Sequence, residues 1–111
     1  AMKTPIRIVK YASPLVQAAI DALPADMQGR LARMFDFIQA NGLEAAPFGW
    51  TKHLEDKLWE LRLSGRDGIA RAIYLTTSGR RLVVLRVFVK KTQKTPPREL
   101  AIARERARLI S

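Results

Sequence analysis

The apolar residues in the first half of the chain recur at helical spacing. Over residues 25–42 they are separated by steps of three, four and one, which places them on one face of a helix. This face consists of Met27, Leu31, Met34, Phe35 and Ile38. Asn41 followed by Gly42 is a typical helix end. We interpret the stripe of Met and Phe side chains as part of the hydrophobic core and not as a ligand site.

A shorter helix is predicted upstream, over residues 13–23. Ser13 is a good N-cap, and Pro14 suits the first helical position, where the backbone N–H has no helical partner. Together with the helix that follows, this segment predicts a helical hairpin over residues 13–41. Residues 6–11 alternate weakly between apolar and polar side chains, which indicates a short N-terminal strand.

The second half of the chain changes to the two-residue period of β-strands. Residues 58–63, 69–76 and 82–89 have this character, and their short connections contain glycine, as β-hairpins require. We therefore predict an antiparallel three-stranded meander. The preceding segment, residues 43–57, has the composition of a loop.

A final helix is predicted after the meander. Thr95 is a candidate N-cap, Pro96 suits the first helical position, and Glu99 lies in the first turn, where the helix dipole favours an acid. The expected fold class is α+β, with an N-terminal strand, a helical hairpin packed on one face of the meander, and a C-terminal helix. We expect one domain over residues 1–111, and we interpret Ala1 before the methionine as a cloning scar.

Strand alternation divides the side chains of the meander between two faces. One predicted face is apolar and packs on the helical hairpin. In the last strand it comprises Val83, Leu85, Val87 and Val89. The opposite face gathers Arg62, Arg71, Arg86 and Lys90, with only Glu60 of opposite charge. Because neither Arg62 nor Arg71 belongs to the predicted core, alanine at either position is expected to leave the fold intact.

The positive charge of the chain is concentrated in its second half, which contains this cationic face. The chain of 111 residues has a net charge of +10. Residues 1–50 hold five basic and four acidic residues, whereas residues 51–111 hold fifteen and six. An asymmetry of this kind indicates a polyanionic partner, either nucleic acid or an acidic protein. The absence of cysteine excludes disulfides, and no apolar run approaches the ~20 residues that span a bilayer, so we expect a cytoplasmic protein.

Cations are the main groups that the chain offers for catalysis. Its single histidine, His53, falls in the predicted loop, and the sequence has no metal-binding spacing, phosphate loop or hydrolase triad. No metal or cofactor is therefore expected. Arginine and lysine can still promote attack of an RNA 2′-hydroxyl on the adjacent phosphate, because the nucleophile belongs to the substrate. Arginine contacts phosphate oxygens in pairs, and a lysine among other cations is better suited to proton transfer than an isolated one.

Three motifs in the second half occur together. They are Leu-Trp-Glu-Leu-Arg at 58–62, the Arg71-x-x-Tyr74 spacing, and Phe88-x-Lys90-Lys91-x-x-Lys94-Thr95-Pro96. Through these motifs residues 51–105 resemble the Gp49-like/HigB-type branch of the RelE/ParE toxin superfamily. The resemblance implies a RelE-like sheet with two helices on one face and an active groove on the other. It also implies a type II toxin–antitoxin toxin that cuts mRNA, typically on the translating ribosome.

The resemblance also implies roles for individual residues. Arg62 and Arg71 would bind and polarise the phosphate, and three lysines would hold RNA or transfer protons, namely Lys90, Lys91 and Lys94. We assign catalysis to Arg62, Arg71 and Lys90, since strand alternation places Lys90 inside the groove. We assign RNA binding to Arg86, Lys91, Lys94, Lys52 and Arg98. Arg86 stands where the family more often has histidine, so it can bind charge but cannot serve as a histidine acid or base.

The expected partners are mRNA, the ribosome and a cognate antitoxin, commonly a helix-turn-helix protein in this branch, with no membrane. Because residues 51–111 hold fifteen basic and six acidic residues, we expect the antitoxin to present an acidic segment. Two other functions stay open, a ParE-like inhibitor that binds DNA gyrase without cutting RNA and a simple nucleic-acid-binding module. The Lys-Lys-x-x-Lys-Thr-Pro segment favours the RNA-cutting branch.

Overall fold

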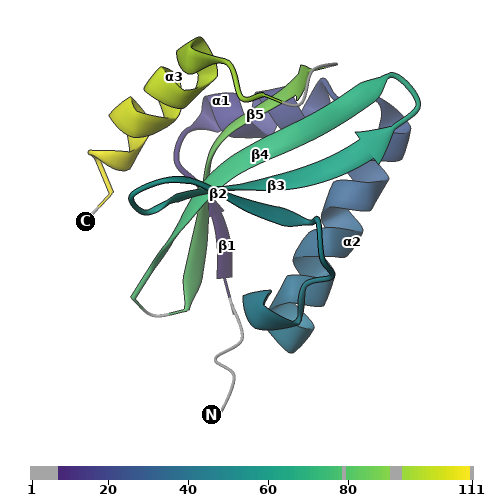
Figure 1. The fold of residues 1–111 in the computed structure, drawn as a ribbon, viewed down its shortest axis with the longest axis horizontal. Coiled ribbons are helices and arrows are strands. Elements are labelled where there is room, and N and C mark those ends of the chain that lie inside the picture. Colours follow the sequence, from purple (N-terminus) through teal and green to yellow (C-terminus); the bar gives the residue numbers. More distant parts are fainter. Residues whose placement is uncertain (1–7, 79, 91–93, 111) are drawn as a thin grey trace.

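The fold is built on one five-stranded sheet with helices on both of its faces (Figure 1). The computed structural model describes residues 8–78, 80–90 and 94–110. In chain order its elements are β1 Ile8–Tyr11, α1 Pro14–Asp21, α2 Ala25–Asn41, the short 3-10 helix η1 Leu43–Ala45, β2 Thr51–Glu55, β3 Leu58–Gly65, β4 Gly68–Thr77, β5 Arg81–Lys90 and α3 Pro97–Ala107. The interpretation of Ala1 lies outside the described residues.

The strand order in the sheet is β1-β5-β4-β3-β2. Strand β1 runs parallel to β5, and the other neighbouring pairs are antiparallel. The predicted α+β class and the meander are therefore confirmed. The prediction of a loop over residues 43–57 was wrong, because Thr51–Glu55 forms the edge strand β2 beside β3. The charged and apolar residues of β2 do not alternate regularly, so they do not form the pattern of a half-buried strand. As an edge strand, β2 pairs with only one neighbouring strand, β3.

The predicted start of the first helix and the predicted end of the second are confirmed, whereas α1 ends at Asp21 and not at residue 23. The Ser13 hydroxyl accepts a hydrogen bond from the Leu15 backbone N–H at 3.1 Å, and Pro14 begins α1. Helix α2 ends at Asn41, after which Gly42 has φ +90°, a conformation that glycine adopts without steric cost.

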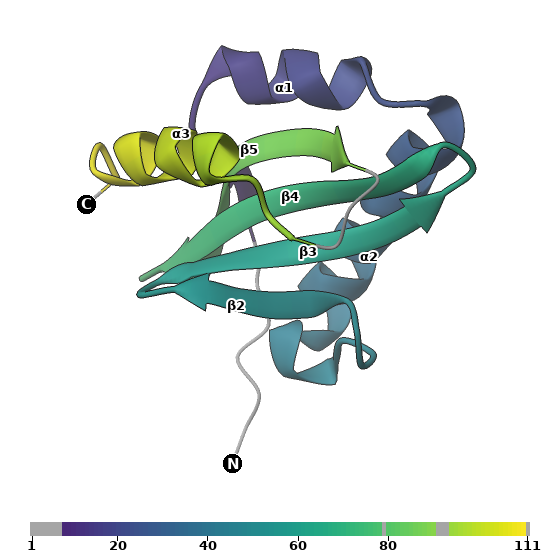
Figure 2. The same ribbon diagram turned by 45° about the horizontal axis from the view of Figure 1, so that its top comes forward.

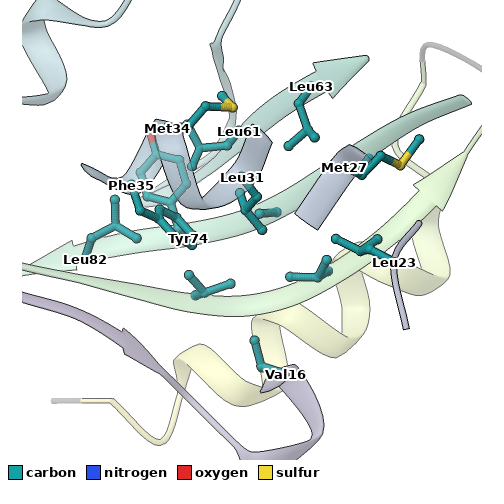
Figure 3. Close-up of a cluster of buried hydrophobic side chains, with 14 of the residues drawn as sticks. Val16, Leu23, Met27, Leu31, Met34, Phe35, Leu61, Leu63, Tyr74 and Leu82 are labelled. Carbon is teal, nitrogen blue, oxygen red and sulfur yellow. The ribbon is translucent and has the colours of Figure 1, made fainter. Parts of the chain in front are cut away.

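The main hydrophobic core lies between these helices and one face of the sheet. The apolar stripe of α2 is buried against side chains of β3 and β4, and Val16 contributes from α1 (Figure 3). The buried sheet residues of this core are Leu61, Leu63, Ala70, Ala72, Tyr74, Leu82, Val84 and Val87. This packing confirms the interpretation of the Met and Phe stripe as core.

A second hydrophobic cluster lies on the opposite face, beneath α3. It contains Val83 and Leu85 of β5, Ile73 and Leu75 of β4, and Ala103 of α3. The predicted continuous face of Val83, Leu85, Val87 and Val89 was therefore wrong. The register between β4 and β5 shifts by one residue between Ile73 and Tyr74, and the inserted residue reverses the alternation along β5. Of these four residues, Val87 packs on the helical hairpin, and Val89 is 38% exposed.

The turn between β3 and β4 approaches α2 closely at Gly65. A Cβ atom at Gly65 would lie 2.6 Å from both Cγ and Cε of the fully buried Met27. We expect Gly65→Ala to lower the free energy of unfolding by about 1–3 kcal/mol, because the core must shift to accept the methyl group. Urea denaturation followed by circular dichroism measures this change.

Gly29→Ala provides the matched control. Gly29 lies within α2, and its added Cβ would meet only the flexible Arg33 side chain, at 3.4 Å. This substitution should stabilise the protein by about 0.5–1 kcal/mol, because alanine favours the helix interior over glycine. Equal stability of the two variants would contradict the close packing of Gly65 on α2.

Candidate active site

A buried ion pair lies at the centre of the sheet face that α3 covers. Glu60 of β3 and Arg71 of β4 are both fully buried, and Glu60 Oε1 lies 3.6 Å from Arg71 Nη1. The same oxygen lies 3.3 Å from Nε of Arg62, whose side chain is 21% exposed. Thr95 closes the network, since its hydroxyl donates to Glu60 Oε2 at 2.7 Å and accepts from Arg71 Nη1 at 3.3 Å.

The strand register explains why these groups meet. Arg62 and Arg71 are direct partners across β3 and β4, and Arg71 is in turn paired with Phe88 of β5. Side chains of such partners lie on the same face of the sheet. Two arginines side by side repel each other, and Glu60, two residues before Arg62, supplies the opposing charge.

Burial lowers the pKa of Arg71 from its ordinary value, because the interior solvates a charge poorly. The negative charge of Glu60 acts in the opposite direction and raises this pKa, whereas the positive charge of Arg62 lowers it further. The Glu60 carboxylate therefore offsets part of the free-energy cost of burying the charged Arg71 guanidinium.

The expectation that Arg71 lies outside the core was wrong. The chain just before α3 passes over this face of the sheet (Figure 2). There the Thr95 hydroxyl contacts both Glu60 and Arg71. The predicted N-cap role of Thr95 was also wrong, because α3 begins at Pro97 with Pro96 as its N-cap. The hydroxyl contacts the sheet instead, which the local sequence around the helix start does not reveal.

Helix α3 also covers part of the predicted cationic face. Arg86 of β5 donates from Nε to Glu99 Oε1 at 2.5 Å, and its side chain is 27% exposed. Arg106 donates from Nη1 to the Leu85 carbonyl at 2.6 Å. Burial and the nearby charge of Arg86 lower the pKa of Arg106. Glu99, predicted only as a favourable first-turn acid, is thus a direct partner of a candidate RNA-binding residue.

The remaining candidate cations that the structure describes are exposed. In the strand register, Lys52 of β2 lies opposite Glu60 of β3, and Lys90 at the end of β5 lies opposite Ile69 of β4. Both lysines are exposed, as are Lys94 and Arg98. Lys91 lies outside the described residues. The structure therefore brings Arg62 and Arg71 together at Glu60 and leaves Lys52, Lys90 and Lys94 exposed.

His53 lies in β2 and not in a loop as predicted. Its Nε2 is 2.8 Å from the Asp56 carbonyl oxygen, and its ring packs edge-on against Trp59 with centroids 4.9 Å apart. Because its neighbour Lys52 shares the face of Glu60, His53 points to the other face, away from the ion pair. Among the described residues, no three His, Asp or Glu side chains form a group that could hold a metal ion.

The fold and this site define an α+β protein that is broadly compatible with the RelE-like architecture, with an arginine pair on the sheet face opposite the N-terminal helices. A profile of the phage-derived Gp49-like protein family (DUF891) matches residues 18–108, and the chain therefore belongs to this family. The family is one of RelE/HigB-like toxins, and membership is consistent with the toxin of a toxin–antitoxin system. No curated protein matches the chain. Within the described part, no helix is long and apolar enough to cross a membrane.

Proposed function

We propose that this protein is the toxin of a type II toxin–antitoxin system and that it cleaves mRNA, on the ribosome, by internal attack of a 2′-hydroxyl. The observation that supports this most strongly is the arginine pair. Arg62 is partly exposed beside the buried Arg71, and Glu60 orients both within 3.6 Å. A guanidinium held in place before substrate binds can stabilise the charge that develops on a phosphate without having to reorganise.

In the proposed reaction, the 2′-oxygen of one nucleotide attacks its own 3′-phosphate and the bond from phosphorus to the 5′-oxygen breaks. The products are a 2′,3′-cyclic phosphate and a 5′-hydroxyl. The proton lost by the 2′-hydroxyl and the proton gained by the 5′-oxygen balance each other. Arg62 contacts the phosphate in this scheme, and Lys90 transfers a proton. Arg71 acts as a positioning residue, because it is fully buried and reaches the site through Glu60 and Thr95.

Exposed cations support RNA as the substrate. Lys52, Lys94 and Arg98 are exposed and can contact the RNA backbone away from the reacting phosphate. Arg86 becomes available to RNA only if the phosphate competes with Glu99 for its guanidinium. An antitoxin with an acidic segment and a helix-turn-helix domain would neutralise the same surface in the inactive complex.

The direct test is to induce the protein in cells and map the 5′ ends of mRNA. Purified protein should also cut mRNA on programmed ribosomes and leave 5′-hydroxyl ends. Inhibition of DNA gyrase without new mRNA ends would overturn the proposal in favour of a ParE-like inhibitor. Binding of RNA without any cleavage would support a simple binding module instead.

Two exposed lysines should differ in their kinetic effects. Lys90 shares a face with Arg71, whereas Lys94 lies in the chain before α3. We expect Lys90→Ala to lower the single-turnover rate at saturating ribosome by about 10²-fold, since proton transfer contributes about 10²–10⁴. Lys94→Ala should mainly raise the ribosome concentration that gives half the maximal rate, and should reduce the salt dependence by about one phosphate contact.

Single-turnover cleavage across ribosome and salt concentrations measures both quantities. Each lysine variant serves as the charge-matched control for the other, because both lose one exposed positive charge. A larger loss of saturated rate in Lys94→Ala than in Lys90→Ala would show that the lysine before α3 transfers the proton.

A further inference from the structure

A pocket of about 680 Å³ lies at the edge of the sheet, next to the arginine–glutamate network. Strand β2 begins at Thr51, opposite Leu61, so the end of β3 extends beyond it toward α2. The pocket combines three arginines with three aromatic residues, namely Arg30, Arg33, Arg62, Phe37, Phe48 and Trp50. Within the described part of the chain, no Asp or Glu lines it.

Phe48 is fully exposed, and a defined turn presents it. The Trp50 N–H donates to the Pro47 carbonyl at 3.1 Å, and Gly49 has φ +93°. These features match a type II turn, in which Pro47 and Trp50 are the end residues and Phe48 occupies the tip. Phe37 and Trp50 form an adjoining aromatic surface, with ring centroids 5.3 Å apart at 68°. An exposed aromatic side chain that adjoins other aromatic rings around one pocket marks a contact surface better than a solitary exposed one.

The arginines place positive charge on two sides of these rings. Arg30 and Arg33 are exposed on α2, and Arg30 Nη1 donates to the Ser64 carbonyl of β3 at 2.8 Å. Arg62 lines the pocket and also belongs to the Glu60 network, where its Nε lies 3.3 Å from the carboxylate. The pocket and the candidate active site therefore share Arg62.

We propose that this pocket binds one unpaired nucleotide of a single-stranded RNA, next to the phosphate held at Arg62. Its base stacks on Phe48 and Trp50, and its phosphate contacts Arg33. Aromatic side chains beside a cationic groove are the combination with which proteins hold single strands, because every base has a flat π-face. An acidic peptide would use the arginines but would leave the exposed aromatic rings without a planar partner. This inference rests on the proposed function only for the position of the strand at Arg62.

The test uses a hexaribonucleotide with 2′-O-methyl groups, which can bind but cannot provide the attacking hydroxyl. In a Trp59→Phe background Trp50 is the remaining tryptophan of the chain, so its fluorescence reports binding at the pocket. Phe48→Ala should raise the Kd about tenfold, within the range measured for base stacking on an aromatic residue. Arg33→Ala should lower the salt slope of binding by about one. The matched controls Leu109→Ala and Arg108→Ala remove exposed residues elsewhere and should change neither quantity.

The outcomes separate this pocket from the proposed cleavage. If the wild-type protein binds the hexamer through Phe48 but cuts no RNA, the pocket stands and the nuclease proposal fails. If it cuts RNA while Phe48→Ala and Arg33→Ala bind and cleave normally, the pocket proposal is overturned. An abasic hexamer should bind equally to wild type and Phe48→Ala, and an undiminished effect of Phe48→Ala would contradict stacking. A dimer that Phe48→Ala converts to a monomer, with hexamer binding unchanged, would identify an interface between two copies and also overturn it.

Discussion

The Arg71→Ala variant should lose about 3–5 kcal/mol of its free energy of unfolding, as is typical when one partner of a buried ion pair is removed. The substitution leaves the Glu60 carboxylate fully buried, where it still contacts Arg62 at 3.3 Å and Thr95 at 2.7 Å. Thr95 loses an accepted hydrogen bond in the same step. Urea denaturation at neutral pH measures the loss, and a marginally stable protein would be largely unfolded at growth temperature.

Two further variants distinguish this explanation from a simple loss of side-chain volume. Arg62→Ala removes a partly exposed arginine from the same carboxylate and should cost less than about 1 kcal/mol. The triple variant Glu60→Leu, Arg71→Met, Thr95→Val replaces the network with apolar groups and should recover most of the stability. If Arg71→Ala kept the wild-type free energy of unfolding, water would have to reach the Glu60 carboxylate. The Glu60–Arg71 ion pair would then not be buried.

The Arg62→Ala variant should lower the saturated rate of mRNA cleavage by about 10²–10³-fold while the protein remains folded. Arg62 reaches the surface and shares the Glu60 carboxylate, so it is held in position before RNA binds. Its loss removes a contact that strengthens as charge develops on the phosphate, and such a contact affects the rate more than the binding. Arg62→Lys should recover part of the rate, since lysine keeps the charge but lacks the planar pair of donors.

Single-turnover cleavage of programmed ribosomes tests this expectation, with Arg108→Ala as the charge-matched control. Arg108 is exposed near the end of the chain and pairs only locally with Glu105, at 3.0 Å. A normal saturated rate for Arg62→Ala, with only a higher half-saturating ribosome concentration, would place Arg62 in binding and not in catalysis. A fully toxic Arg62→Ala variant would remove the arginine pair from the proposed active site.

Local patterns were sufficient for most of the secondary structure. The α2 stripe and the Ser13–Pro14 start each depend on residues within one or two turns, and both predictions are confirmed. The hairpin strands were also predictable, because glycines mark their turns. Strand β2 was missed, since an edge strand is defined by its partner more than by its own composition.

The shared face of Arg62, Arg71, Arg86 and Glu60 could be predicted from the chain alone, because side chains along each strand alternate and β-turns set the register. Which of these side chains reach solvent depends on tertiary packing. The bulge in β5 moved Leu85 beneath α3, and the chain before α3 placed Thr95 over Arg71 and Glu99 against Arg86. Glu60 and Thr95 are 35 residues apart, so their contact depends on the path of the whole chain. The exposure of a charged side chain therefore follows from what packs above the sheet, which no local pattern in the strands encodes.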